Sequence, residues 1–508
     1  MRRQSGILLP IFSLPSRYGI GTMGKSAYEF IDFLEASGQT LWQILPVGPT
    51  GYGDSPYQSF STFAGNPYFV DLEELQEEGL LQVEEVQEAA QSGNVDHVEY
   101  GSLFQNRRPL LLKASQRGYG TYGEEEQSFY RDNQDWLPDY ALYQALKTCF
   151  GYIPYWEWPE ALRDRDSAAL EEYREKLREE IQMHCFTQFL FDRQWKNMKK
   201  YAEEHGIEII GDLPIYVACD SADTWSHPEL FMLDENRRPT EVAGVPPDAF
   251  CDEGQLWGNP IYNWEKHRKT GYAWWIRRME VAVKRYDLVR IDHFRGFVGY
   301  YSIPGGSPNA KNGEWKAGPG MELFRQLGGH ISMQSLIAED LGFLDEPVRA
   351  LLKDTGLPGM KVLLFGLDGD DSEYLCHNYQ PNTVAYIGTH DNETFNGWLF
   401  NPETPAGSRQ NAMEYLRLRE SEGYHWGAIY TMMASVAQRV IFQMQDVLGL
   451  SNYARMNTPA TPMGNWQWRM RSDVLTERLS QKLLKCTKAY HRSINTNLKN
   501  ARYRPYCQ

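Results

Sequence analysis

The stretch Asp287-Leu-Val-Arg-Ile-Asp-His-Phe-Arg295 is a short apolar run that ends in a carboxylate, Asp292. Two further runs end in the same way, Ser335-Leu-Ile-Ala-Glu339 and Thr383-Val-Ala-Tyr-Ile-Gly-Thr-His-Asp391. Such runs are typical of buried parallel strands, and β/α folds place their chemistry just after the carboxyl ends of these strands. The three acids are 47 and 52 residues apart, which suits one strand, one helix and two loops each. The pattern predicts three strands of one barrel that aim three acids at one pocket.

Strand signals occur at eight places, which is the number of strands that a closed (β/α)8 barrel needs. They lie at residues 6–10, 40–46, 207–212, 288–292, 336–339, 361–365, 384–387 and 451–455. Between the first two, Ser26 and Glu29 have the spacing of a capping box, and Gly38 has the position of a helix terminator. The sequence therefore predicts an α/β fold, a TIM barrel without a C-terminal β-sandwich domain.

Two parts of the chain interrupt the alternation of strands and helices. Residues 50–197 are mainly helical and carry acidic stretches at 75–90 and 167–186, which we interpret as solvated helix faces. Residues 218–275 include an aperiodic loop near 246–257 that is rich in Pro, Gly and acidic residues. We therefore predict one catalytic barrel over residues 1–508 with two insertions.

The composition restricts the class of substrate. A formal charge of −16 disfavours a broad surface for nucleic acid or an anionic membrane, so a neutral substrate is expected. Aromatic residues reach 13%, and their rings suit both core packing and the apolar faces of sugars. The seven cysteines form no C-x-x-C pair, and neither a signal peptide nor a membrane span is apparent. We expect a cytoplasmic protein without a structural zinc site.

The three acids match the needs of glycosidic bond cleavage. One carboxylic acid must protonate the leaving oxygen, and a second carboxylate must attack the sugar or activate water. Asp292, Glu339 and Asp391 supply these groups, although each could also cap the helix that follows its strand. Arg290 lies two residues before Asp292, so both side chains point to the same face of the strand. His293 and His390 could donate hydrogen bonds to sugar hydroxyls.

Several long motifs resemble the amylomaltase (4-α-glucanotransferase, disproportionating enzyme) family over nearly the whole chain. They are Trp42-Gln-Ile-Leu-Pro-Val-Gly-Pro-Thr-Gly-Tyr-Gly-Asp-Ser-Pro-Tyr57, Gly211-Asp-Leu-Pro-Ile-Tyr-Val217, Gln255-Leu-Trp-Gly-Asn-Pro260, Arg455-Met-Asn-Thr-Pro459 and Gly464-Asn-Trp466. α-Amylases usually have an Asn-His pair where this chain has Pro214-Ile-Tyr-Val217, which favours amylomaltase over amylase.

By this resemblance Asp292 is the nucleophile, Glu339 the general acid/base, and Asp391 the acid that holds sugar hydroxyls. The loop at 246–257 is similar to the lid of the family, in which Phe250 and Trp257 could stack on glucose rings. The other substrate-binding positions that the resemblance and the motifs indicate are Tyr57, Asp212, Gln255, Asn259, Arg290, His293, His390, Asn457, Asn465 and Trp466.

The resemblance implies a retaining transfer of α-1,4-glucan segments from a maltooligosaccharide, starch or glycogen donor to the 4-hydroxyl of glucose or another glucan. No cofactor or catalytic metal is expected. We predict that burial and the Asp292 charge raise the pKa of Glu339, that Arg290 and hydrogen bonds lower the pKa of Asp292, and that the two carboxyl groups lie about 5–5.5 Å apart. A glucan hydrolase with the same acids, or a non-catalytic glucan-binding protein, is the alternative.

Overall fold

The computed structural model describes residues 3–51, 53–90, 95–247, 252–342, 344–461 and 463–493. Eight parallel strands form one sheet in the order β10-β11-β12-β1-β2-β3-β6-β9. Ala338 N donates to Pro358 O at 3.0 Å, which brings β9 against the start of β10 and completes the ring. The strands are β1 (Gln4–Leu8), β2 (Leu41–Gln43), β3 (Glu208–Leu213), β6 (Leu288–Ile291), β9 (Leu336–Ala338), β10 (Gly359–Val362), β11 (Thr383–Tyr386) and β12 (Arg439–Gln443). The predicted TIM barrel is confirmed.

The barrel interior is filled by side chains from every strand, as the two-residue period of a strand requires. These residues form one buried cluster: Leu8, Leu41, Ile210, Leu288, Ile337, Met360, Val362, Val384, Tyr386 and Ile441. The alternate positions face outward into a larger core beneath the surrounding helices. The barrel is therefore a packed support whose chemistry lies at its rim.

The eighth strand differs from the prediction. It is β12, which pairs with β1 and β11, whereas the predicted strand at 451–455 contains the 3₁₀ turn η10 (Asn452–Ala454). The Tyr453 side chain in that turn is 63% exposed, which a barrel strand does not allow. The apolar run of β12 follows closely on the apolar helix α17 (Tyr424–Ala434), so no change of hydrophobic period separates the two in the sequence.

The first helix, α1 (Lys25–Ala36), begins one residue before the predicted cap. The capping-box prediction for Ser26 and Glu29 is wrong, because Gly24 is the N-cap and no side chain caps it. A Cβ atom at Gly24 would lie 2.1 Å from the Asp71 carboxylate, so that side chain leaves no room for a capping residue. The predicted end of the helix is confirmed, since Gly38 has a left-handed φ of +73° and donates to Glu35 O.

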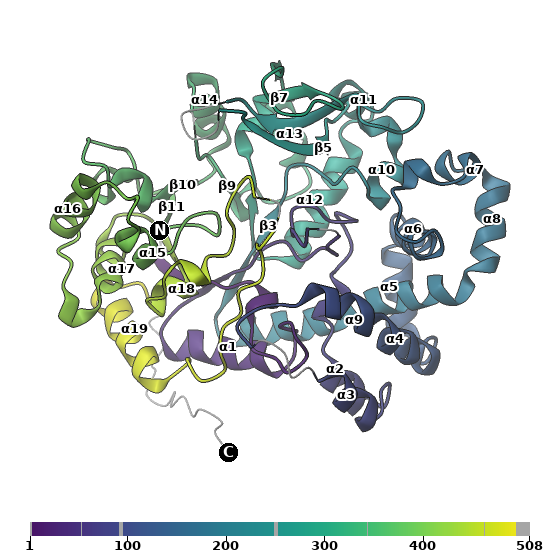
Figure 1. Ribbon diagram of the computed structural model, residues 1–508, viewed down its shortest axis with the longest axis horizontal. Helices are drawn as coiled ribbons and strands as arrows, with labels where there is room; N and C mark the ends of the chain where they lie inside the picture. Colours follow the sequence, from purple (N-terminus) through teal and green to yellow (C-terminus); the bar gives the residue numbers. More distant parts are fainter. Residues whose placement is uncertain are drawn as a thin grey trace.

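The connection between β2 and β3 holds eight α-helices within the described residues, drawn in blue in Figure 1. Its last helix, α9, packs against α1, α4 and α6 and leads directly into β3. The eight are α2 (Leu72–Glu77), α3 (Val83–Ala89), α4 (Tyr100–Gly118), α5 (Glu124–Asp132), α6 (Leu137–Cys149), α7 (Glu160–Arg163), α8 (Ser167–Lys176) and α9 (Arg178–Glu204).

The remaining helices surround the barrel or connect its strands. They are α10 (Ala222–Ser226), α11 (Trp264–Lys269), α12 (Ala273–Arg285), α13 (Met321–Leu327), α14 (Glu346–Thr355), α15 (Phe395–Phe400), α16 (Ala406–Tyr415), α18 (Met444–Val447) and α19 (Glu477–Ala489). Among the described residues no helix combines the length and the apolar character needed to cross a membrane.

A four-stranded antiparallel sheet, in the order β5-β4-β7-β8, was not predicted. Two of its strands come from the predicted second insertion and two from the segment after β6, so the pairing joins distant parts of the chain, and Figure 1 shows β5 and β7 together beside α13. Its strands are β4 (Glu241–Val245), β5 (Gln255–Pro260), β7 (Gly299–Pro304) and β8 (Glu314–Ala317).

Candidate active site

A cavity of about 740 Å³ opens at the carboxyl ends of the barrel strands, a size ordinary for a small-molecule site. Most of the predicted site residues line it: Tyr57, Gln255, Trp257, Asn259, Arg290, Asp292, His293, Glu339, His390, Asp391, Asn457, Asn465 and Trp466. Asp212 is an exception, because its side chain is fully buried beneath the floor. The prediction for Phe250 concerns a residue outside the described part of the chain.

Arg290 connects two acids beneath the cavity. Its Nη1 donates to both carboxylate oxygens of Asp212 at 2.7 Å and to Asp292 Oδ1 at 3.0 Å. Asp212 and Arg290 are register partners on the adjacent strands β3 and β6, which brings their side chains to the same face. Asp292 follows β6 directly, and its side chain is 27% exposed. The structure thus presents one carboxylate to the cavity and holds the other below it.

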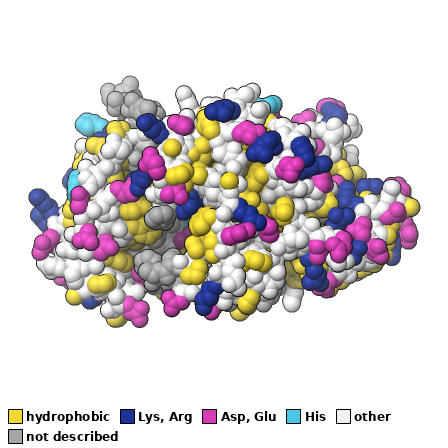
Figure 2. All heavy atoms as spheres, turned by 90° about the horizontal axis from the view of Figure 1, so that it is seen from above, with side chains coloured by type: hydrophobic (Ala, Val, Ile, Leu, Met, Phe, Trp, Pro, Cys, Tyr) yellow, Lys and Arg dark blue, Asp and Glu magenta, His cyan; other side chains and the backbone are white. Residues whose placement is uncertain are grey.

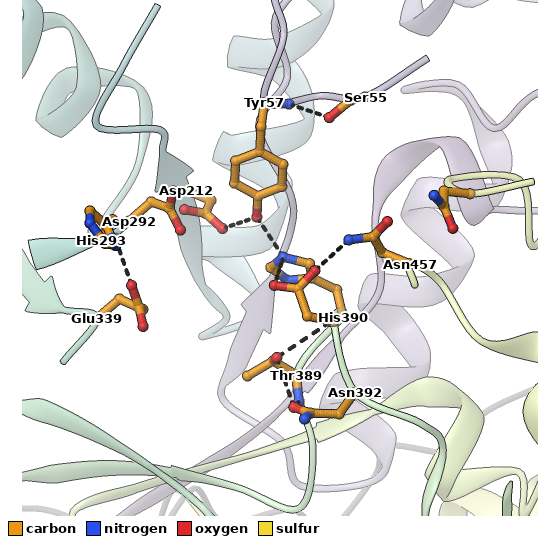
Figure 3. Close-up of polar contacts among 12 residues, drawn as sticks. Ser55, Tyr57, Asp212, Asp292, His293, Glu339, Thr389, His390, Asn392 and Asn457 are labelled. Carbon is orange, nitrogen blue, oxygen red and sulfur yellow. Dashed lines mark hydrogen bonds and ion pairs between the residues drawn. The ribbon is translucent and has the colours of Figure 1, made fainter. Parts of the chain in front are cut away.

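Glu339 lies directly after β9 and is held by main-chain amides. His293 N donates to Glu339 Oε2 at 2.6 Å (Figure 3). Leu341 N donates to Glu339 Oε1 at 3.1 Å. His293 adopts a left-handed φ of +50°, so the chain turns sharply just after Asp292. The carboxyl group of Glu339 is therefore fixed in orientation beside the loop that carries Asp292.

The ionisation of these two acids differs in part from the prediction. Burial raises the pKa of Glu339, as expected, against the opposing effects of Arg290 and the two amides. Burial also raises the pKa of Asp292, to about 7, so the predicted lowering is wrong. Arg290 does oppose this rise, but its charge is shared with Asp212, and the charges of Asp212 and Glu339 raise the Asp292 pKa further. The pKa of Asp292 therefore depends on whether Glu339 is charged.

Asp391 is held from two sides. Asn457 Nδ2 donates to Asp391 Oδ1 at 2.6 Å, and His390 Nε2 lies 3.3 Å from Asp391 Oδ2. Tyr57 Oη donates to Asp212 Oδ2 at 2.8 Å and lies 2.9 Å from the same His390 nitrogen. Because the single hydroxyl hydrogen of Tyr57 is used toward Asp212, His390 Nε2 must donate to Tyr57. Figure 3 shows this chain of contacts crossing the floor of the site.

The charges of His390 and Asp391 support each other. Burial by itself lowers the pKa of His390, but the charge and hydrogen bond of Asp391 raise it above its usual value. Burial likewise raises the pKa of Asp391, but His390 and the Asn457 amide outweigh it and hold the pKa well below the usual range. Asp391 is therefore an ionised acceptor for hydroxyl groups at neutral pH.

The residues of β5 form the opposite wall of the cavity. The Trp257 ring meets the His293 ring edge-on at 4.9 Å, and Trp257 Nε1 donates to Gln255 Oε1 at 3.1 Å. Asn259 is buried and donates to Val217 O at 2.8 Å, while it accepts from Gln58 Nε2 at 2.8 Å. Asn259 thus joins the end of β5 to neighbouring segments, while Gln255, Leu256 and Trp257 of this strand are the more exposed residues of the wall.

Two predicted residues near the C-terminal side of the cavity belong to a tight loop. Asn465 accepts from Thr458 N at 2.9 Å and donates to Thr461, so its amide holds the loop together. Trp466 has a left-handed φ of +62°, and its ring lies 5.7 Å from that of Tyr57. The contact of Asn465 with substrate stays a prediction.

Sequence reasoning missed two residues that complete the site. Gln58 ties Asn259 and Trp257 O to the segment next to Tyr57, and its position directly after a quoted motif was the available signal. Leu341 contributes a main-chain amide, for which a side chain gives no signal. Within the described residues, no group of three or more His, Cys, Asp or Glu side chains is arranged to hold a metal ion.

Comparison with known proteins gives a consistent result. A family model described as 4-alpha-glucanotransferase matches residues 9–476. A 4-alpha-glucanotransferase from Clostridium butyricum is 47% identical over 95% of this chain and 99% of its own length. Another from Thermus thermophilus is 47% identical over 92% of this chain and 95% of its own length. The structure of an amylomaltase from Streptococcus agalactiae in complex with acarbose is similar with a TM-score of 0.94 at 43% identity, covering 97% of this chain and all of that one.

Proposed function

The chain belongs to the 4-alpha-glucanotransferase family, and on that premise we propose how its three acids divide the transfer of a glucan. The activity itself, moving 4-α-glucan segments between sugars, is that of the family. The observation that carries the assignment is that each of the three acids has different neighbours. Asp292 contacts Arg290, Glu339 is oriented by two amides, and Asp391 is kept ionised beside His390.

In the first half of the proposed reaction, an oxygen of Asp292 attacks the anomeric carbon of the donor. The bond from that carbon to the glycosidic oxygen breaks, and the proton of Glu339 moves to the departing oxygen. A glucosyl ester on Asp292 remains. The pKa of Glu339, which burial raises, supports its protonated starting state.

In the second half, the 4-hydroxyl of an acceptor sugar gives its proton to Glu339, and its oxygen forms a bond to the anomeric carbon while the ester bond to Asp292 breaks. Two inversions at the same carbon retain the α-configuration. Asp391 and His390 hold hydroxyls of the bound glucose, whose ring flattens in the transition state. We assign maltooligosaccharides, starch or glycogen as donors, and glucose or another glucan as acceptors.

Incubation with maltotriose tests both the transfer and the role of Asp292. Transfer gives glucose together with maltopentaose and longer chains, whereas an α-glucan hydrolase gives glucose and maltose without longer products. Asp292→Asn should reduce turnover at least about a thousandfold because it removes the nucleophile. Glu314→Gln, a matched change of an exposed carboxylate on β8, should leave turnover unchanged. Full activity of Asp292→Asn would reject the assignment.

A further inference from the structure

Arg455 lies behind the active site, just after the turn η10. Its side chain is half-buried, and it is absent from the lining of the catalytic cavity. Its guanidinium contacts two main-chain carbonyls: Nη2 donates to Asp391 O at 2.7 Å, and Nε donates to Asn457 O at 2.8 Å. Arg455 therefore contacts the backbone of both loops whose side chains meet in the site.

These contacts close a ring around the third acid. Asn457 N donates to His390 O at 3.1 Å, and the Asn457 side chain donates to the Asp391 carboxylate at 2.6 Å. Arg455 bridges the carbonyls of the same two residues from the other side. The only further contact of the Asp391 backbone within the described hydrogen bonds is a long one of 3.4 Å, from Asp391 N to Thr389 Oγ1.

Asp391 is not positioned directly by a barrel strand. β11 ends at Tyr386, so the acid lies five residues into a loop, whereas Asp292 and Glu339 directly follow their strands. Asn457 likewise lies in a loop after η10. A planar guanidinium with donors in a fixed fork can hold two carbonyls at a set separation, which a single ammonium group does less well.

We propose that Arg455 is a positioning residue for the transfer reaction: it locks the Asp391 loop to the Asn457 loop so that the Asp391 carboxylate meets the sugar in its transition-state shape. The proposal rests on the role assigned to Asp391 above. Because Arg455 does not touch the substrate, its loss should displace Asp391 without removing any sugar-binding group. The rate of the chemical step should therefore fall more than the affinity for the donor.

The test compares Arg455→Ala and Arg455→Lys with the wild type in maltotriose disproportionation. Arg455→Ala should lower kcat about a hundredfold, as misplacement of a catalytic group by about 1 Å does, with the donor KM changed by less than about threefold. The kcat of Arg455→Lys should lie between those of the wild type and Arg455→Ala. Guanidinium at low millimolar concentration should raise the kcat of Arg455→Ala by about tenfold, because the free cation can occupy the space between the two carbonyls.

Arg469→Ala is the matched control. Arg469 is another arginine of the C-terminal segment, more buried than Arg455, and its Nη2 donates to a main-chain carbonyl, Ser16 O, at 2.6 Å, away from Asp391. This variant should keep kcat and should not respond to guanidinium. Equal losses in the two alanine variants, or a folded Arg455→Ala with kcat within threefold of the wild type, would overturn the proposal. If Arg455→Ala fails to fold, unimpaired kcat in Arg455→Lys overturns it. A wild type that forms no longer chains would instead reject the proposed function.

Discussion

At the scale of single residues, Arg290 explains both a success and a failure of sequence reasoning. Its proximity to Asp292 followed from their spacing on one strand and is confirmed at 3.0 Å. Its effect on the Asp292 pKa did not follow, because Asp212, 78 residues away in sequence, takes two of the hydrogen bonds of the guanidinium. The three acids could be found from their own strands, whereas their charge states depend on neighbouring strands.

The coupling of Asp292 and Glu339 predicts a pH shift. In Glu339→Gln the charge that raises the Asp292 pKa is absent, so this pKa should fall and Asp292 should be ionised at lower pH. An activated donor such as an α-maltosyl fluoride needs no acid to leave, so fluoride release reports attack by Asp292 alone. In the pH profile of fluoride release, the acidic limb should lie at lower pH for Glu339→Gln than for the wild type. An unmoved limb would contradict the coupling.

Asp446 predicts a pH effect on stability. It is buried and accepts from Phe395 N at 2.6 Å, and burial raises its pKa to about 7 against the effect of that hydrogen bond. Since an unfolded Asp titrates near 3.9, its contribution to stability is full below about pH 4 and is lost as the pH rises to about 7. Asp446→Asn keeps an oxygen acceptor but removes the titration.

Urea unfolding at pH 5 and pH 7 measures this contribution. The free energy of unfolding should fall by about 2–3 kcal/mol more in the wild type than in Asp446→Asn over this range. Parallel pH dependence in the two proteins would show that Asp446 titrates normally in the folded state.

At the scale of elements, strands with a distinct apolar run could be predicted from the sequence. Strands without such a run of their own could not. β6 and β9 each combine an apolar run with a terminal acid, and both were placed within one residue of their observed bounds. β12 was missed because its run follows an apolar helix without an intervening change of period. β8 carries mostly exposed residues and pairs antiparallel with the preceding strand β7, so its own residues give no apolar signal for a strand.

The close contact of β1 and β2 gives a test of the barrel. Gly6 and Leu41 are register partners, and a Cβ atom on Gly6 would lie 2.3 Å from Leu41 O. Gly6→Ala should therefore destabilise the protein by about 1–3 kcal/mol through overpacking. Gly407→Ala is the control, because Gly407 lies in α16 with no atom within 4 Å of the added Cβ, and it should stabilise by about 0.5–1 kcal/mol. Urea denaturation of both variants measures the two effects.

At the scale of the whole molecule, we propose that residues 1–508 act as one catalytic barrel with insertions at about 50–197 and 218–275. The first insertion carries interspersed acidic and basic side chains, visible at one end of Figure 2 and paired in contacts such as Arg163–Asp164 at 2.7 Å and Arg174–Glu171 at 3.5 Å. This mixture supports the interpretation of its charge runs as solvated helix faces. The catalytic cavity lies at the barrel rim, where only the start of this insertion, including Tyr57 and Gln58, contributes to the lining.

A net charge of −16 combined with a neutral substrate predicts insensitivity to salt. Raising NaCl from 50 to 500 mM should change kcat/KM for maltotriose by less than about twofold, because screening acts on charged partners. The contacts that set the charges of Asp292 and Asp391 are short and buried, so they should persist at high salt. A tenfold fall in kcat/KM with intact structure would indicate a charged group in the bound substrate.

The register of β3 against β6 has a consequence for the folding of the chain. Asp212 and Arg290 face each other only when these strands pair as observed, since a slip of one residue turns every side chain of a strand to its opposite face. A slipped barrel would bury Asp212 without its cation, at a cost of several kcal/mol. The Asp212–Arg290 ion pair therefore also favours the observed register of the sheet. A chain that pairs β3 and β6 in another register loses this ion pair, and with it both stability and the contact of Arg290 that supports Asp292.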